Sequence, residues 1–173
     1  DAPLLQFLLA SIARQSFPKE ELEILIMRQG NSEEAKAYGI QQARGAILGL
    51  LCADNELLQA SFLSDMVTAA ESSQVVGAYP ARYAWVREDR PLNRYFALLG
   101  ANDPLCWWLG KADRQSYLHT QPSPLCTIRE FRQTIPSIGD NGFFVKAAAI
   151  KPFVIDPSRH FCIDVCEDMR RAG

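Results

Sequence analysis

The sequence predicts an α/β protein with a mainly parallel β-sheet sandwiched between helices. Two observations support this prediction: short apolar runs alternate with segments of helical periodicity, and turn residues separate them. Strands that alternate with helices usually lie parallel, because each helix forms the crossover between two strands. We expect one domain over residues 1–173, because a chain of 173 residues can bury a substantial core.

The first elements follow from local patterns. Apolar residues recur at helical spacing over residues 3–15, which predicts an amphipathic helix. Residues 22–27 are apolar and partly β-branched, and they predict a buried strand. Asn31 and Glu34 have the spacing of a capping box, so a helix is expected to run from about residue 32 to residue 44.

The alternation continues through the middle of the chain. Residues 46–53 predict a second buried strand that leads directly into Asp54-Asn55. Helical spacing returns over residues 62–70, and residues 75–79 predict a third strand that Pro80 ends. Ligands of parallel sheets bind beyond the carboxyl ends of the strands, and Asp54 has such a position.

The pattern is looser after residue 81. Residues 93–110 predict one or two helices, and residues 111–138 predict irregular structure with several prolines. A strand is expected at residues 142–146, followed by a short helix at residues 147–150. The last stretch, residues 160–173, carries acidic and then basic side chains.

Composition narrows the class of protein. Hydrophobic residues make up 48% of the chain and charged residues 22%, which is typical of globular proteins. The formal net charge is −2, which argues against a nucleic-acid partner. The cysteine count of five is odd, so we expect reduced thiols and a cytoplasmic protein. His160, Cys162 and Cys166 lie close together, but their spacing favours structural thiols over a zinc site.

Asp54 is the most informative candidate residue. A carboxylate at the end of a buried strand contributes little to packing, whereas Mg²⁺ or Mn²⁺ requires oxygen ligands and can bridge a diphosphate. The alternative is that Asp54 and Asn55 form only a turn and the cap of the next helix.

Several motifs in a fixed order resemble those of family 2 glycosyltransferases. A helix ends in Ser-Ile-Ala-Arg-Gln-Ser-Phe-Pro (11–18), and a strand follows at 22–26. Ala-Arg-Gly (43–45) then precedes a strand that ends in Cys-Ala-Asp-Asn (52–55), in the place of the family's Asp-x-Asp motif. Gly139-Asp-Asn-Gly is similar to a later donor-sugar strand, and Glu167-Asp168 resembles the family's acidic catalytic motif.

The resemblance implies a type A glycosyltransferase fold and an inverting transfer from a nucleotide-sugar donor, with UDP-sugar favoured, to a saccharide or lipid-linked acceptor. Asp54 would be the ligand of Mg²⁺ or Mn²⁺, and a carboxylate would take the proton from the acceptor hydroxyl. The implied residues are Asp168, Glu167 or Asp164 as the base, Arg44, Asp54 and Asn55 at the nucleotide and metal, and Gly139, Asp140, Asn141, Trp107 and Trp108 at the substrates.

Each of these residues also has a simpler interpretation. The three acids fit a solvated helix start, and Arg44 fits a cation at a helix C-terminus. Trp107 and Trp108 fit the core, an acceptor groove or a membrane surface beside a lipid-linked acceptor. The localisation expected from these features is cytoplasmic, at the inner face of the membrane if the acceptor is a lipid.

The sequence departs from the family pattern in three ways. The opening strand of the family is not found before residue 3, residues 27–30 replace a longer connection, and Cys52 replaces the first aspartate. We therefore expect further segments in the complete protein. A non-catalytic nucleotide- or saccharide-binding protein is the alternative, with Cys52 marking a lost metal site. A nucleotidyltransferase is disfavoured, because no Gly-rich phosphate loop is present near the start.

Overall fold

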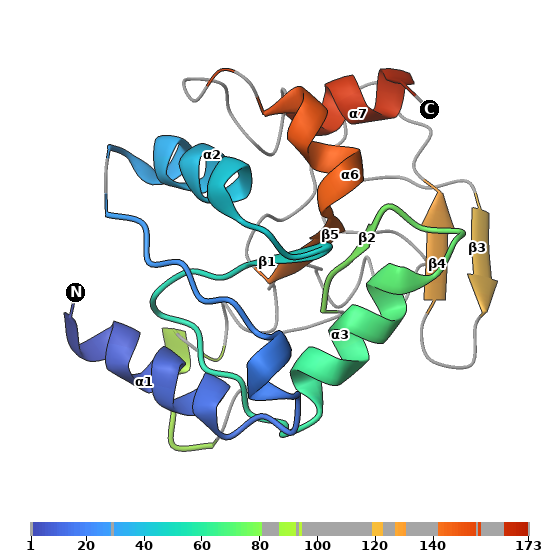
Figure 1. Ribbon diagram of the computed structural model, residues 1–173. Helices are drawn as coiled ribbons and strands as arrows, with labels where there is room; N and C mark the ends of the chain where they lie inside the picture. Colours follow the sequence, from blue (N-terminus) through green and yellow to red (C-terminus); the bar gives the residue numbers. More distant parts are fainter. Residues whose placement is uncertain are drawn as a thin grey trace.

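The computed structural model describes residues 2–28, 30–80, 87–92, 94, 119–122, 127–130, 142–154, 156 and 165–172. Its elements are α1 (Ala2–Ala13), η1 (Lys19–Glu21), α2 (Ser32–Gln42), β1 (Ile47–Leu50), α3 (Phe62–Glu71), β2 (Gly77–Ala78), β3 (His119–Pro122), β4 (Thr127–Glu130), β5 (Phe143–Lys146), α6 (Ala147–Ile150), η2 (Lys151–Phe153) and α7 (Cys166–Ala172). Figure 1 shows their arrangement.

The predicted helices of the first half are present with nearly the expected bounds. The capping box at the start of α2 is confirmed: the Asn31 side chain accepts bonds from the backbone N–H groups of Glu33 and Glu34, and the Glu34 carboxylate accepts one from the Asn31 N–H. These bonds satisfy amide groups that have no partner inside the first helical turn. Local sequence chemistry therefore sets where α2 begins.

The predicted mainly parallel sheet of a type A glycosyltransferase is wrong. The sheet that contains β1 has three strands in the order β1-β5-β2, and both pairings with β5 are antiparallel. β1 and β2 do run in the same direction, but β5 lies between them and forms the hydrogen bonds with both. The apolar pattern identified these strands, but it carried no information about the strand that would enter between them.

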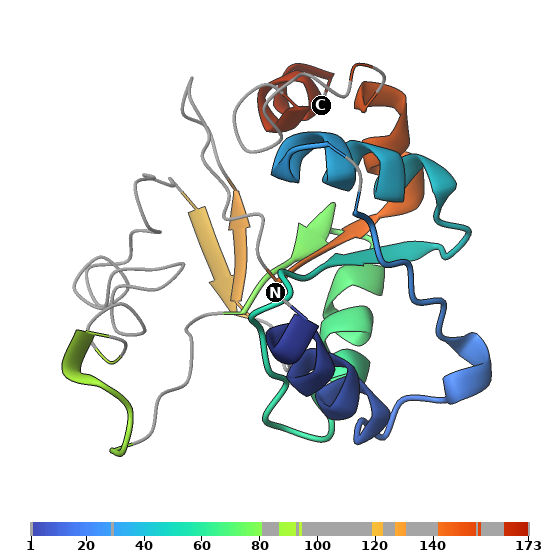
Figure 2. The same ribbon diagram turned by 90° about the vertical axis from the view of Figure 1, so that its left-hand side faces the viewer.

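Helices lie on both faces of this sheet, as Figure 2 shows. A first core cluster on one face joins β5 to α2 and α6, and a second on the other face joins it to α1 and α3. Neighbouring side chains of β5 alternate between the faces: Phe143 and Val145 belong to the first cluster, and Phe144 belongs to the second. All three are at most 4% exposed, so β5 is buried on both faces.

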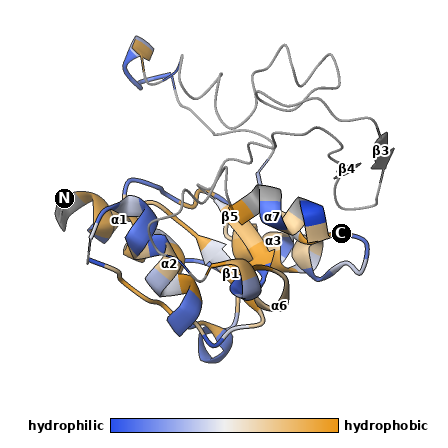
Figure 3. Cartoon of the chain, turned by 90° about the horizontal axis from the view of Figure 1, so that it is seen from above, coloured by the Kyte–Doolittle hydropathy of each residue, from blue (hydrophilic) through white to orange (hydrophobic). Residues whose placement is uncertain are grey.

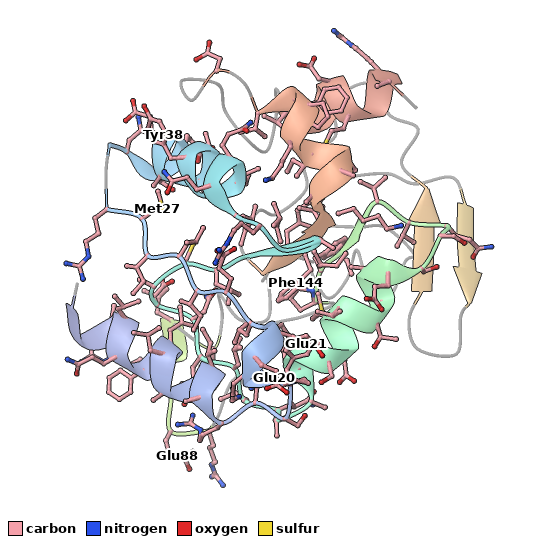
Figure 4. All side chains as sticks on the ribbon, viewed as in Figure 1. Glu20, Glu21, Met27, Tyr38, Glu88 and Phe144 are labelled. Atoms are coloured by element: carbon pink, nitrogen blue, oxygen red, sulfur yellow. The ribbon has the colours of Figure 1, made fainter. Side chains whose placement is uncertain are left out.

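Phe144 shows how the second face is packed. Its ring meets that of Phe62 on α3 edge to face, with the centroids 5.9 Å apart. On the opposite strand Gly49 leaves room for this ring, because a Cβ atom there would lie 2.8 Å from the Phe144 Cε1 atom. Figure 4 labels Phe144 between the sheet and α3.

Two further predictions are wrong. Residues 22–28 form no strand, and Ile24, Leu25 and Ile26 are 48%, 40% and 46% exposed instead of buried. Residues 111–138 were expected to be irregular, yet β3 and β4 form a two-stranded antiparallel sheet within them. A local pattern cannot show whether a partner strand is available, and both errors have this cause.

Other expectations fall outside the described residues. The helices expected over residues 93–110 lie there except for Arg94, as do His160, Cys162 and most of the irregular segment. In the part of the chain that the structure describes, no helix has both the length and the apolar character required to cross a membrane.

The close approach of β2 to β5 leads to a prediction. A Cβ atom at Gly77 would lie 2.5 Å from the Phe144 carbonyl oxygen and 2.8 Å from the Phe143 ring. Gly77→Ala should therefore lower the free energy of unfolding by about 1–3 kcal/mol, because the backbone must move apart. Urea unfolding followed by circular dichroism measures this change.

Gly39→Ala is the matched control. A Cβ atom at Gly39 would meet only the flexible Met27 side chain, 3.1 Å away, and alanine favours the helix α2 by up to about 1 kcal/mol over glycine. Equal destabilisation by the two substitutions would contradict the packing described for β2.

Candidate functional site

The Asp54 turn, residues 52–55, follows the end of β1. The Asn55 N–H donates to the Cys52 carbonyl oxygen at 3.0 Å, and the Cys52 N–H donates to the Asn55 side-chain oxygen at 3.2 Å. These two bonds close the turn and leave Ala53 and Asp54 at its tip. Asp54 is exposed, so its carboxylate faces solvent at the end of a strand. Asn55 has the turn role that the simpler interpretation gave it, but the helix cap in that interpretation is wrong, because Ser61 is at the N-cap of the next helix, α3.

The start of β5 lies beside this turn. Leu50 at the end of β1 pairs with Phe143, and the Gly142 N–H donates to the Leu50 carbonyl oxygen at 2.7 Å. Gly142 has a φ of 78°, which favours glycine. The predicted substrate residues Gly139, Asp140 and Asn141 lie outside the described residues, but they directly precede Gly142 in the sequence. The antiparallel pairing of β5 with β1 therefore places Gly142, the residue that follows this motif, at the end of β1 from which the Asp54 turn begins.

The loop after the turn is held by two buried polar side chains, one on α1 and one two residues beyond its end. The Ser11 hydroxyl donates to the Leu8 carbonyl oxygen at 2.7 Å and accepts from the Leu57 N–H at 3.0 Å. Gln15 donates to the Gln59 carbonyl oxygen at 3.0 Å and accepts from the Leu63 N–H at 3.1 Å. We call Ser11 and Gln15 the loop clamp; they are 0% and 5% exposed.

The loop clamp explains part of the Ser-Ile-Ala-Arg-Gln-Ser-Phe-Pro motif. Backbone groups that are shielded from solvent need hydrogen-bond partners, and Ser11 on α1 and Gln15, two residues beyond its end, supply them. Ser16 extends the contact, because its N–H and its hydroxyl both donate to the Ala60 carbonyl oxygen, at 2.8 and 3.0 Å. The Arg14 guanidinium adds an exposed ion pair with Glu56 at 3.0 Å.

Arg44 has a partner within the described residues. Its side-chain Nε lies 2.7 Å from one Glu23 oxygen, and its backbone N–H donates to the other oxygen at 2.8 Å. This pair connects residues 22–28 to the turn between α2 and β1. The Arg44 side chain is 85% exposed, so the nucleotide contact predicted for it would be made from the surface.

The predicted acidic residues near the C-terminus belong to a different layer of the structure. Glu167 and Asp168 lie in α7, and Asp168 is half-buried. Val165 and Met169 pack on the first cluster, whereas Leu57 after the Asp54 turn packs in the second cluster. The segment that contains Asp168 therefore packs on the first cluster, whereas the chain that follows Asp54 packs in the second. Asp164, Trp107 and Trp108 lie outside the described residues.

The donor set at the Asp54 turn is small. Among the described residues, no group of three or more His, Cys, Asp or Glu side chains is arranged to hold a metal ion. Asp54 supplies one carboxylate, while the Asn55 side-chain oxygen is engaged by the Cys52 N–H. One carboxylate fits an Mg²⁺ or Mn²⁺ ion that arrives with a diphosphate, because substrate phosphates and water then complete its coordination.

Comparisons with known proteins leave the family open. No protein-family model matches the chain, and neither the curated proteins nor the solved structures provide a significant match. The functional interpretation therefore depends on the residues themselves. Sequence reasoning missed the roles of Ser11 and Gln15, because their backbone partners lie more than forty residues further along the chain and leave no local signal.

The loop clamp leads to a stability prediction. Gln15→Leu should lower the free energy of unfolding by about 1–3 kcal/mol, because the buried Leu63 N–H and Gln59 carbonyl lose their partner. Ser11→Ala should act in the same direction through the Leu57 N–H. Hydrogen exchange should also accelerate at the Leu63 amide in Gln15→Leu and at the Leu57 amide in Ser11→Ala, and NMR measures these exchange rates residue by residue.

Ser73→Ala is the control for the loop clamp, since Ser73 is exposed after the end of α3. It should change stability by less than about 0.5 kcal/mol. Unchanged exchange at Leu57 and Leu63 in the clamp variants would contradict the assigned role.

The Glu23–Arg44 pair leads to a prediction about pH. The Arg44 backbone N–H, followed by its guanidinium, holds the pKa of the Glu23 carboxyl below its ordinary value. Because the folded pKa is depressed, the stabilisation is present above the unfolded pKa and is lost as the pH falls through the folded pKa. Glu23→Gln should remove this acid-side dependence.

An NMR titration of the Glu23 carboxyl provides the measurement. Arg44→Gln should raise the pKa of Glu23 only part of the way, because the backbone bond, the larger cause, remains. Arg14→Gln, which removes a distant exposed pair, should leave the titration of Glu23 unchanged. A Glu23 pKa that is insensitive to Arg44→Gln would refute the side-chain contribution.

Proposed function

We propose that the chain belongs to a glycosyltransferase that moves a sugar from a nucleotide-sugar donor, with UDP-sugar favoured, to a saccharide or lipid-linked acceptor. The observation that carries the proposal is the Asp54 turn, which holds an exposed carboxylate at the end of β1 beside the start of β5. The proposal depends on this arrangement and on the order of the motifs. It does not require the parallel sheet that was expected from the sequence.

The chemistry of the proposed reaction explains why a carboxylate would stand there. When the bond to the sugar breaks, negative charge develops on the leaving nucleoside diphosphate. A divalent cation held at Asp54 would supply electrostatic stabilisation of that charge. By holding this cation, the carboxylate would fix the position of the diphosphate relative to β1.

A rigid turn favours this role. The cross-bonds between Cys52 and Asn55 fix the backbone at Asp54, and the loop clamp fixes the chain after it. A side chain that is already oriented loses less conformational freedom when a ligand binds. Glycines 139 and 142 frame the motif that leads into β5, where the proposal places contacts with the donor sugar.

The transfer also requires a base for the acceptor hydroxyl. Asp168 is the first candidate, with Glu167 and Asp164 as rivals. The base would take the proton as the hydroxyl attacks the anomeric carbon from the face opposite the leaving diphosphate. This geometry inverts the configuration of the sugar. We propose a cytoplasmic location, at the inner face of the membrane if the acceptor is lipid-linked.

A non-catalytic nucleotide- or saccharide-binding protein is the second candidate. The observation in its favour is Cys52, an exposed thiol in the place where the motif would carry its first aspartate. A soft thiol is a poor ligand for Mg²⁺ or Mn²⁺ compared with a carboxylate. In this alternative the Asp54 turn would bind a nucleotide or a saccharide without catalysing a reaction.

Calorimetric titration with UDP, GDP and dTDP, with and without Mn²⁺, tests the proposal. One nucleotide should bind with a requirement for Mn²⁺, and Asp54→Asn should weaken that binding at least about tenfold, because it removes the ligand charge. Asp65→Asn is the matched control, since Asp65 is an exposed aspartate on α3. It should bind the nucleotide as the unmodified protein does.

Two outcomes separate the candidate functions. Metal-dependent release of the nucleoside diphosphate from its sugar conjugate supports the transferase, whereas nucleotide binding without turnover supports the binding protein. Absence of binding by every nucleotide to the folded chain would refute the donor site at Asp54.

A further inference from the structure

Residues 22–28, which we call the apolar segment, form an unusual part of the surface. Ile24, Leu25 and Ile26 are consecutive and are 48%, 40% and 46% exposed. Figure 3 shows a hydrophobic trace that leads toward the start of α2. Isolated exposed apolar residues are common on protein surfaces, but three in succession on an extended chain favour a contact surface.

Beyond Leu22, whose N–H donates to the Lys19 carbonyl oxygen, the backbone of the apolar segment has no hydrogen-bond partner among the described residues. Within the described part of the chain, no backbone–backbone hydrogen bond involves residues 23–28. The segment contains β-branched residues, and it lacks the lysine or proline with which natural edge strands discourage pairing. It therefore offers both the hydrogen-bonding groups and the side chains of a strand that another strand could extend.

Three contacts hold the apolar segment against the rest of the molecule. Glu23 accepts bonds from the Arg44 backbone and side chain, and Met27 lies against Gly39 of α2. Leu22 packs against the second cluster. An extended segment fixed at both ends has already lost much of its freedom, so pairing with it costs less conformational entropy.

The charges at its two ends identify a complementary partner. Glu20 and Glu21 are exposed at the beginning, and Arg28 is exposed at the end. Figure 4 labels Glu20, Glu21 and Met27, and it shows that the acidic pair lies at the opposite end of the segment from Met27. Two copies in antiparallel orientation bring each acidic end to the Arg28 of the other copy. A parallel arrangement would place like charges together.

We propose that two copies of this chain associate through antiparallel pairing of their apolar segments about a twofold axis. The pairing satisfies backbone groups that have no partner in the described part of the chain, and it covers Ile24, Leu25 and Ile26. The same surface serves both copies, so the contact closes as a dimer. This inference is independent of the glycosyltransferase proposal.

Sedimentation velocity over a concentration series provides the first test. The unmodified chain should form a dimer, and the double variant Ile24→Lys/Ile26→Lys should weaken it about a hundredfold, because charge replaces apolar contact on both copies. Leu58→Lys/Leu92→Lys is the matched control, since these leucines are 59% and 62% exposed outside the segment. It should leave the dimer intact.

A charge exchange provides the second test, and the weakening by each variant alone identifies the orientation. Arg28→Glu alone should weaken the dimer about tenfold, as should Glu20→Arg/Glu21→Arg alone, because each places like charges at both ends of the contact. Mixing the two variants should restore association, since each acidic end then meets a basic end. Circular dichroism confirms that each variant is folded.

The possible outcomes decide the proposal. A monomer at every concentration, or a dimer unaffected by the Ile24 and Ile26 substitutions, would overturn it. Failure of the mixed charge variants to associate better than either alone would overturn the antiparallel arrangement. Nucleotide binding by the same variants is measured in a separate calorimetric titration, so loss of the dimer does not affect the test of Asp54.

Discussion

The structure depends on the pairing of β5 with both β1 and β2. These two neighbours come from the first half of the chain, and neither is hydrogen-bonded to the other within the described residues. β5 connects them and supplies Phe143 and Val145 to one core cluster and Phe144 to the other. Removal of this strand would separate the sheet and expose both hydrophobic clusters, since the helices on the two faces pack on the same strand.

The candidate site follows from the same pairing. The bond between Gly142 and Leu50 sets where the chain enters β5, and that position is the end of β1 from which the Asp54 turn begins. The loop clamp then holds the chain after the turn against α1. A carboxylate on a supported turn is a reasonable position for a cation that comes with a diphosphate, and a poor one for a preformed metal cage.

Local chemistry made part of this structure predictable from the sequence. The capping box at Asn31 and Glu34 located the start of α2, and the apolar run at residues 142–146 located β5. The direction and order of the strands could not be predicted, because β5 pairs with residues almost a hundred positions away. Residues 22–27 have the composition of a strand but pair with no strand among the described residues, and composition alone does not distinguish these two cases. Asp54 could be found from its position after a strand, whereas the loop clamp required knowledge of what α1 contacts.

The central claim is that the Asp54 turn and the start of β5 form one nucleotide–metal site. Paramagnetic relaxation measured by NMR tests this claim most directly. Mn²⁺ added with the nucleoside diphosphate broadens the NMR signals of nearby amide groups, and the broadening falls steeply with the distance between the ion and the amide proton. The expected result is selective broadening of residues 53–55 and Gly142, with little effect at Glu71 at the far end of α3. Uniform weak broadening, or broadening centred on another part of the chain, would contradict the account.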